Sequence, residues 1–176
     1  MKFNSDLNSI KAIAANIQML LLDVDGVLTD GRLYFSNSGE EFKSFHTLDG
    51  HGIKMLMSLG VEVGIITGRQ SEIVRKRSAD LGIKLLYQGR EDKLNVLQEI
   101  VASRNIATSA IAYAGDDLPD LPVLRAVGLS FSVPAGHPRV VTEVHAITDA
   151  PAGLGAVREI TDYLIEARSA YGRFLH

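Results

Sequence analysis

Short runs of consecutive apolar residues alternate along this chain with segments whose apolar residues recur at helical spacing. A run such as Met19 to Leu22, which ends at Asp23, is typical of a strand buried on both faces, as in a parallel sheet. Strands that alternate with helices predict an α/β fold with right-handed crossovers. We expect strands over 19–22, 61–66, 84–87, 110–114, 128–133 and 144–148, and helices over 3–16, 53–59, 71–81, 91–102, 119–125 and 155–170.

Length and composition favour one globular domain over residues 1–176. The chain is 46% hydrophobic and 22% charged, which excludes disorder as its main state. Its net charge of −3 argues against a basic footprint for nucleic acid or a membrane surface, and the absence of cysteine excludes disulfides and thiolate metal sites. Because neither a signal-peptide pattern nor a membrane-spanning apolar run is present, we expect a cytoplasmic protein with no nucleic-acid or membrane partner.

A β-hairpin is expected over about 31–46, between the first strand and the next helix. Its two strands, 32–35 and 41–45, flank a polar turn that contains Gly39. The hairpin is rich in apolar and aromatic side chains, and an exposed apolar hairpin on a monomer favours aggregation. We therefore predict that other copies of the chain cover it. The alternative is that the hairpin folds back onto its own domain. The side chains concerned are Leu33, Tyr34, Phe35, Phe42 and Phe45.

Polar residues follow three of the expected strands at the point where each strand ends. In open α/β sheets the ligand crevice lies outside the carboxyl ends of the strands. Several carboxylates in one crevice repel each other unless a cation is present, and oxygen ligands without cysteine or paired histidines favour Mg²⁺. The alternative is that these aspartates are ordinary turn and helix-cap residues. The residues concerned are Asp23, Asp25, Thr67, Asp116, Asp117 and Asp120.

Four segments resemble, in order and in strand context, the motifs of the haloacid dehalogenase superfamily of phosphotransferases. They are residues 23–29 (DVDGVLT), residues 67–69 (TGR), Lys93, and residues 115–120 (GDDLPD). The resemblance implies a Rossmann-like parallel sheet flanked by helices. It also implies a phosphatase that requires Mg²⁺.

The same resemblance assigns chemical roles to individual residues. It implies that Asp23 is the nucleophile, which forms an aspartyl-phosphate, and that Asp25 is a general acid and then a general base. Mg²⁺ would be held by Asp23, the backbone carbonyl of Asp25, and Asp116. Thr67 would donate a hydrogen bond to phosphate, and Lys93 would offset developing negative charge. At the start of a helix, Lys93 is also compatible with an ordinary solvated side chain.

The spacing of the motifs leaves no room for a cap domain, either between Asp25 and Thr67 or between Thr67 and Lys93. An uncapped site must accept a bulky substrate or be covered by another chain. Segments 45–53 and 153–159 are similar to those of a capless subgroup, typified by the 3-deoxy-D-manno-octulosonate 8-phosphate phosphatases. Members of that subgroup form tetramers through the hairpin, so the resemblance implies a homotetramer.

The subgroup implies a phosphorylated sugar acid as substrate. The leading candidate is 3-deoxy-D-manno-octulosonate 8-phosphate, a lipopolysaccharide precursor, and the alternative is a nonulosonate 9-phosphate. An arginine guanidinium suits bidentate binding of the substrate carboxylate, although Arg77 is also compatible with a solvated position. Leu154 departs from the arginine common there in the subgroup, and the tail after Arg168 is short, which weakens the sugar assignment. The predicted substrate-binding residues are Gly26, Asp49, Gly68, Arg69 and Arg77.

Two hypotheses from other functional classes remain. One is a non-catalytic regulatory domain that keeps the fold, which the four intact motifs disfavour. The other is a receiver domain of the response-regulator kind, which also carries paired acids, a threonine and a lysine at strand ends. Asp25, two residues after Asp23, and the hairpin both disfavour the receiver.

Overall fold

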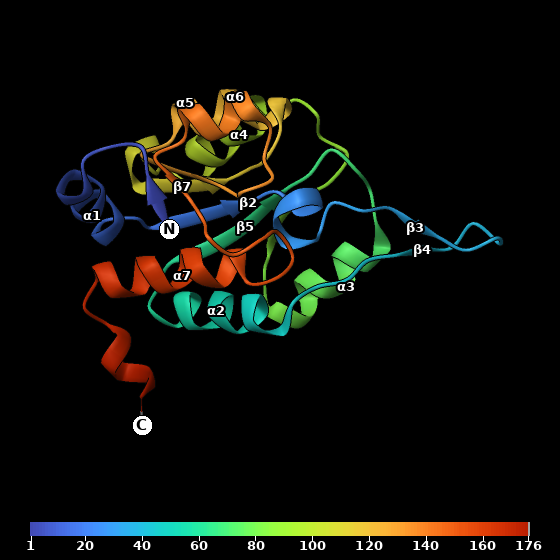
Figure 1. The fold of residues 1–176 in the computed structure, drawn as a ribbon, viewed down its shortest axis with the longest axis horizontal. Helices are drawn as coiled ribbons and strands as arrows, with labels where there is room; N and C mark the ends of the chain where they lie inside the picture. Colours follow the sequence, from blue (N-terminus) through green and yellow to red (C-terminus); the bar gives the residue numbers. More distant parts are fainter. Residues whose placement is uncertain (176) are drawn as a thin grey trace.

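A seven-stranded sheet forms the centre of the computed structural model, which describes residues 1–175 (Figure 1). Its strand order is β1-β9-β8-β7-β2-β5-β6, and every neighbouring pair is parallel except β1 with β9. The predicted α/β fold with a sheet flanked by helices is confirmed. The strands are β1 (Lys2–Phe3), β2 (Met19–Leu22), β5 (Glu62–Ile66), β6 (Leu85–Tyr87), β7 (Ile111–Ala114), β8 (Leu129–Ser132) and β9 (Ala146–Ile147).

Helices cover both faces of the sheet (Figure 1). Helices α4, α5 and α6 lie on one face, and α2, α3 and α7 lie on the other, with α1 packed against α7. A hydrophobic core lies on each side of the sheet. Alternate residues of β2 pack into one core or the other, because successive side chains of a strand point to opposite faces. The helices are α1 (Leu7–Ala15), α2 (Thr47–Ser58), α3 (Glu72–Leu81), α4 (Lys93–Arg104), α5 (Leu121–Ala126), α6 (Pro138–Glu143) and α7 (Ala156–Ala167).

The strands of the hairpin insertion project well beyond the body of the domain (Figure 1). Within the described chain, the hairpin strands β3 (Tyr34–Phe35) and β4 (Glu41–Phe42) pair only with each other. Phe35 is 59% exposed and Phe42 is 54% exposed, whereas Phe45 at the root packs against the core. In the single chain the hairpin tip is therefore not folded back onto its own domain.

Three details of the predicted secondary structure were wrong. The sheet is not wholly parallel, because β1 adds an antiparallel edge strand too short to leave a periodic signal. Helix α6 was missed, and its six residues likewise span too few turns for a helical pattern. Helix α2 begins at Thr47 rather than at residue 53. The prediction placed its start too late because the early turns contain Gly50 and Gly52, which are poor helix formers.

These two glycines are explained by close packing around α2. A Cβ atom on Gly50 would lie 2.3 Å from a guanidinium nitrogen of Arg77 on α3, and one on Gly52 would lie 2.2 Å from Oγ1 of Thr161 on α7. The absence of these side chains lets α2 approach both neighbouring helices. Tertiary contact thus outweighs helix propensity at the start of α2.

Within residues 1–175, none of the helices combines the length and the apolar character needed to cross a membrane.

Gly52→Ala should destabilise the fold even though alanine favours helix formation by about 1 kcal/mol. The new methyl group would collide with the rotamer-restricted Thr161 side chain, and overpacking of this kind costs about 1–3 kcal/mol. Chemical denaturation of the variant should show a lower free energy of unfolding. Gly172→Ala is the matched control, because no atom of residues 1–175 lies within 4 Å of the added Cβ. Equal stability of the two variants would contradict this packing argument.

Candidate active site

A cavity of about 670 Å³ opens at the carboxyl ends of β2, β5 and β7. The parallel pairing of β2 with β7 places Leu22 opposite Ala114, so the residues after both strands emerge side by side. The Asp23 N–H donates to the Ala114 carbonyl at 3.0 Å and extends this register by one step. The lining residues are Asp23, Asp25, Gly31, Thr67, Gly68, Arg69, Glu91, Lys93, Asp116, Asp117, Pro119 and Asp120.

The loop after β2 depends on Gly26. Its φ of +96° lies in a region that side-chain-bearing residues avoid, and a Cβ there would stand 2.2 Å from Oδ2 of Asp116. Gly26 therefore lets the loop from β2 and the loop from β7 come into contact. This predicted substrate-binding residue shapes the cavity through its backbone and does not itself line it.

Three carboxylates from the β2 and β7 loops form the centre of the site. One oxygen from each of Asp23, Asp116 and Asp120 lies within 4.8 Å of the others, an arrangement that could hold a metal ion. The Nζ atom of Lys93, the first residue of α4, lies 3.0 Å from Oδ1 of Asp23 and 2.7 Å from Oδ1 of Asp120. The structure thus brings together Asp23, Lys93 and Asp116, and Asp120, which the sequence analysis placed in the same crevice, joins them.

Asp120 links the parts of this centre through the hydrogen bonds that its two carboxylate oxygens accept. Its Oδ1 accepts hydrogen bonds from Lys93 and, at 2.5 Å, from the hydroxyl of the buried Tyr113. Its Oδ2 accepts the backbone N–H groups of Asp116 and Asp117 at 3.1 and 3.2 Å. Asp120 therefore fixes both the lysine and the loop that carries Asp116.

The electrostatics of the centre favour a bound cation. Burial, followed by repulsion from Asp120, raises the pKa of Asp23 to about 7 despite the opposing effect of Lys93. Burial and the charge of Asp23 also raise the pKa of Asp116 to about 7. Burial lowers the pKa of Lys93, but Asp23 and Asp120 outweigh it, so the pKa lies above its ordinary value.

The donor set fits a hard divalent cation such as Mg²⁺. All of the candidate ligands are oxygens, and the buried Oδ1 of Asp116 has no hydrogen-bond partner within the described chain. A cation there would satisfy this oxygen. It would also reduce the repulsion that raises both carboxyl pKa values.

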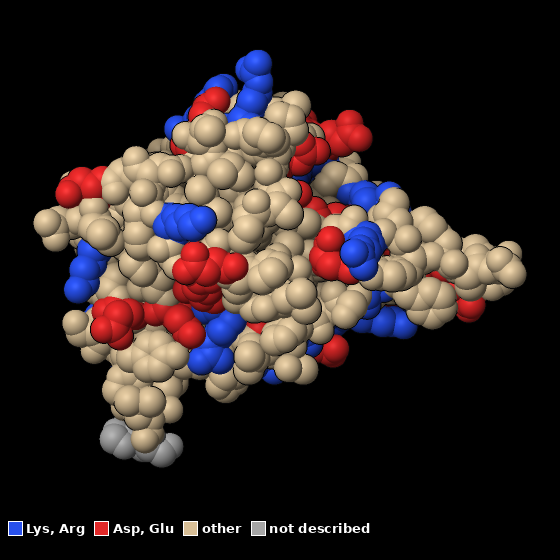
Figure 2. Space-filling view, in the orientation of Figure 1, with Lys and Arg blue, Asp and Glu red and all other residues tan. Residues whose placement is uncertain are grey.

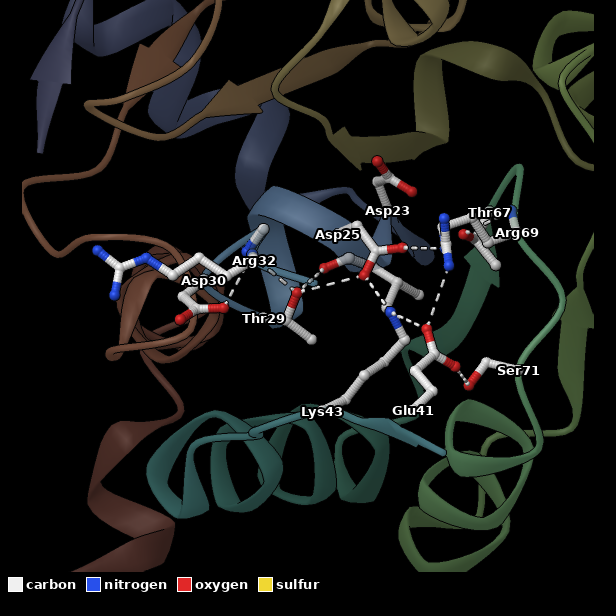
Figure 3. A network of polar contacts seen from close by, with 12 residues as sticks. Asp23, Asp25, Thr29, Asp30, Arg32, Glu41, Lys43, Thr67, Arg69 and Ser71 are labelled. Atoms are coloured by element: carbon white, nitrogen blue, oxygen red, sulfur yellow. Dashed lines mark hydrogen bonds and ion pairs between the residues drawn. The ribbon is translucent and has the colours of Figure 1, made fainter. Parts of the chain in front are cut away.

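Asp25 lies on the side of the cavity next to the hairpin. Its Oδ1 is 2.5 Å from Nζ of Lys43, and its Oδ2 is 3.8 Å from Nε of Arg69 (Figure 3). Thr67 and Gly68 follow β5 and line the same cavity, and Arg69 is 46% exposed at its mouth. The structure therefore gathers these four predicted residues at one site.

Two predicted substrate-binding residues lie elsewhere. Asp49 is buried on α2, where its Oδ1 accepts the backbone N–H of Arg158 at 2.7 Å. The guanidinium of Arg77 on α3 stacks over the ring of Phe45, 5.7 Å from its centre, and donates to a backbone carbonyl. Neither side chain lines the cavity, and both join elements of the fold. Their role in substrate binding stays a prediction.

Sequence reasoning missed Glu41 and Lys43, two charged residues of the hairpin that reach the site. Figure 2 shows other acidic and basic side chains on the surface where the hairpin leaves the body, whereas the side chain of Lys43 is only 1% exposed. The signal was present in the alternation Glu41-Phe42-Lys43, which places both charged residues on the strand face opposite Phe42.

In protein stripped of divalent cations, the carboxylate cluster should destabilise the fold as pH rises. Asp23 and Asp116 bind protons more tightly when folded, so their contribution falls between about pH 4, where the unfolded groups titrate, and about pH 7. At pH 8, Asp116→Asn should therefore unfold with a free energy about 1–2 kcal/mol higher than wild type, and the gain should vanish near pH 4. Chemical denaturation with a chelator present measures it. Asp117→Asn, at an exposed position, is the control; a gain for Asp116→Asn that does not vary with pH would contradict the prediction.

Comparisons with known proteins agree with this geometry. A family model of haloacid dehalogenase-like hydrolases matches residues 86–160. The chain is 46% identical to the 3-deoxy-D-manno-octulosonate 8-phosphate phosphatase KdsC of Escherichia coli K12, over 89% of this chain and 84% of that protein. It is 44% identical to the enzyme of the same name from Yersinia pestis, over 88% of this chain and 83% of that protein.

Solved structures of relatives share the fold almost completely. The 3-deoxy-D-manno-octulosonate 8-phosphate phosphatase of Moraxella catarrhalis, solved with magnesium, phosphate and KDO, superposes with a TM-score of 0.94 at 38% identity, over 97% of this chain and 98% of that one. The Yersinia pestis enzyme gives a TM-score of 0.92 at 42% identity, over 94% of this chain and 89% of that one. This chain therefore belongs to the haloacid dehalogenase-like hydrolases, in the family of the 3-deoxy-D-manno-octulosonate 8-phosphate phosphatases.

Proposed function

We propose that this enzyme is a Mg²⁺-dependent phosphatase that hydrolyses 3-deoxy-D-manno-octulosonate 8-phosphate to the free sugar acid and phosphate. The observation that carries the proposal is the position of Asp23, which faces the cavity beside Lys93 and within a cation-sized cluster with Asp116. The sugar is supported by the relatives' names and by the KDO in the Moraxella catarrhalis structure.

Each residue then has a chemical task. Asp23 and Asp116, with the backbone carbonyl of Asp25, would hold Mg²⁺, which would neutralise charge on the phosphoryl oxygens. A carboxylate oxygen of Asp23 attacks phosphorus, and the bond to the sugar oxygen breaks. Lys93 offsets the negative charge at Asp23, and the hydroxyl of the buried Thr67 donates a hydrogen bond to the phosphoryl group.

Asp25 moves the proton in both halves of the reaction. It first donates a proton to the leaving sugar oxygen, and it then accepts one from the water that hydrolyses the aspartyl-phosphate. Its carboxylate lines the cavity, as this double task requires. Gly68 lines the same cavity.

Asp23→Asn and Asp25→Asn should fail at different points. Asp23→Asn should abolish turnover, because an amide cannot attack phosphorus and brings no charge to the cation. Asp25→Asn should allow slow phosphorylation of Asp23 while blocking hydrolysis of the intermediate. Phosphate release and acid-stable incorporation of labelled phosphate, measured with Mg²⁺ and with a chelator, separate these outcomes. Substantial turnover by folded Asp23→Asn, or wild-type turnover by Asp25→Asn, would contradict the respective role.

Arg69 is placed to recognise the substrate carboxylate. Its guanidinium stands at the cavity mouth, nearly half exposed, and a guanidinium binds carboxylates in a bidentate manner. Arg69→Ala should raise KM for the sugar-acid phosphate about tenfold or more, and raise it much less for a small phosphate ester without a carboxylate. Equal losses on both substrates would remove this role.

A substrate panel decides the sugar. Phosphorylated eight-carbon and nine-carbon ulosonates should be compared by kcat/KM, and the proposal predicts preference for the eight-carbon compound. Preference for a nonulosonate 9-phosphate would replace the sugar but leave the phosphatase chemistry in place.

We further propose that the hairpin mediates a homotetramer, in which neighbouring chains shield the uncapped site. Support comes from the exposed Phe35 and Phe42 on strands that lack any partner in the described chain other than each other. Phe35→Asp together with Phe42→Asp should give a smaller species by native mass measurement. Activity on the sugar-acid phosphate should fall more than activity on a small ester. A fully active wild-type monomer would contradict the assembly.

A further inference from the structure

Lys43 is a buried cation supplied to the site by the hairpin. Its side chain is 1% exposed, although lysine is rarely buried without strong compensation. The compensation comes from two carboxylates, because Nζ lies 2.5 Å from Oδ1 of Asp25 and 3.3 Å from Oε1 of Glu41. Lys43 does not line the cavity itself. Its contact with the site is made through Asp25.

The ion pair continues into a chain of alternating charges (Figure 3). Oε1 of Glu41 accepts from Arg69 at 3.4 Å, and its Oε2 accepts from the hydroxyl of Ser71 at 3.0 Å. Burial raises the pKa of Glu41, but the bonds from Ser71 and Lys43 outweigh it, so the pKa is lowered and the carboxylate stays charged. Glu41 thereby holds Lys43 on one side and Arg69 on the other.

We propose that Lys43 is a positioning residue that fixes the carboxylate of Asp25 for proton transfer. This inference rests on the proposed function of the site. Lys43 binds one oxygen of Asp25 and Arg69 approaches the other, so the carboxylate is held between two cations in one orientation. Because Lys43 comes from the hairpin root, the insertion takes part in the reaction and does not serve assembly alone.

The proposed step explains why a cation is useful at this position. When the bond between phosphorus and the sugar oxygen breaks, the sugar oxygen takes the proton of Asp25, and Asp25 is left as a carboxylate. Lys43 stabilises that carboxylate at the moment it forms. In the second half-reaction the carboxylate takes a proton from water, and the same ion pair orients it toward the cavity.

Stability of the hairpin is a weaker explanation of the pair. Replacement of a buried ion pair by apolar residues is often neutral or stabilising, so burial of a lysine is a poor way to anchor a strand. The root of the hairpin already has an apolar anchor in Phe45, which packs against the core. A catalytic task accounts for the charge, whereas an anchoring task does not.

The test compares first-turnover phosphorylation rates of Lys43→Met and wild type on two substrates. The sugar-acid phosphate has a leaving oxygen that needs a proton, whereas 4-nitrophenyl phosphate has one that does not. Lys43→Met should slow the first about 10- to 100-fold and the second less than threefold, with KM nearly unchanged. Lys43→Arg should restore part of the rate. Lys84→Met, an exposed lysine before β6, should leave both rates unchanged.

A double-mutant cycle with Asp25→Asn shows whether Lys43 acts through Asp25. In that background, Lys43→Met should change the rate on the sugar-acid phosphate less than twofold. Equal losses on both substrates, or the same loss with and without Asp25, would overturn the inference. If Lys43→Met does not fold, Lys43→Gln is judged by the same criteria. A wild-type enzyme inactive on sugar-acid phosphates would instead overturn the proposed function, and this inference with it.

Discussion

The mutual repulsion of three carboxylates is the constraint around which this site is organised. A single lysine, Lys93, counters part of that repulsion. Parallel pairing of β2 with β7 forces Asp23 and Asp116 into one crevice, and Asp120 adds a third negative charge. Lys93 neutralises part of that charge, whereas burial, followed by the repulsion between the carboxylates, raises the pKa values of Asp23 and Asp116. In the proposed function, a divalent cation and a phosphoryl group would bind here together, because each would reduce the electrostatic cost of the other.

The central part of this arrangement could be predicted from the sequence. Buried strands give continuous apolar runs, and the residues that follow them must meet at one edge of a parallel sheet. For that reason the convergence of Asp23, Thr67 and Asp116 follows from the order of the strands, whereas the place of Lys93 followed only from the family resemblance. The exact partners of Asp120 follow from neither, because they depend on how the loop after β7 folds back on itself.

Other features depend on tertiary contacts that leave no local pattern. The start of α2 runs against helix propensity, since Gly52 is required by the closeness of α7. Asp49 looked like a ligand-binding residue, yet it accepts a backbone N–H at the start of α7. The alternation in the hairpin indicates a charged strand face, but the partner of Lys43 could not be predicted, because Lys43 meets Asp25 only when the insertion folds over the loop after β2.

The central claim is that Asp23 is the residue that becomes phosphorylated during turnover. The enzyme is mixed with Mg²⁺ and the sugar-acid phosphate and quenched during the first turnover. Borohydride then reduces an aspartyl-phosphate to homoserine at the phosphorylated position. Peptide mass spectrometry should find that conversion at position 23, with none at Asp25, Asp116 or Asp120. Reduction at one of those residues, or unmodified aspartate throughout in an enzyme that is turning over, would contradict the account.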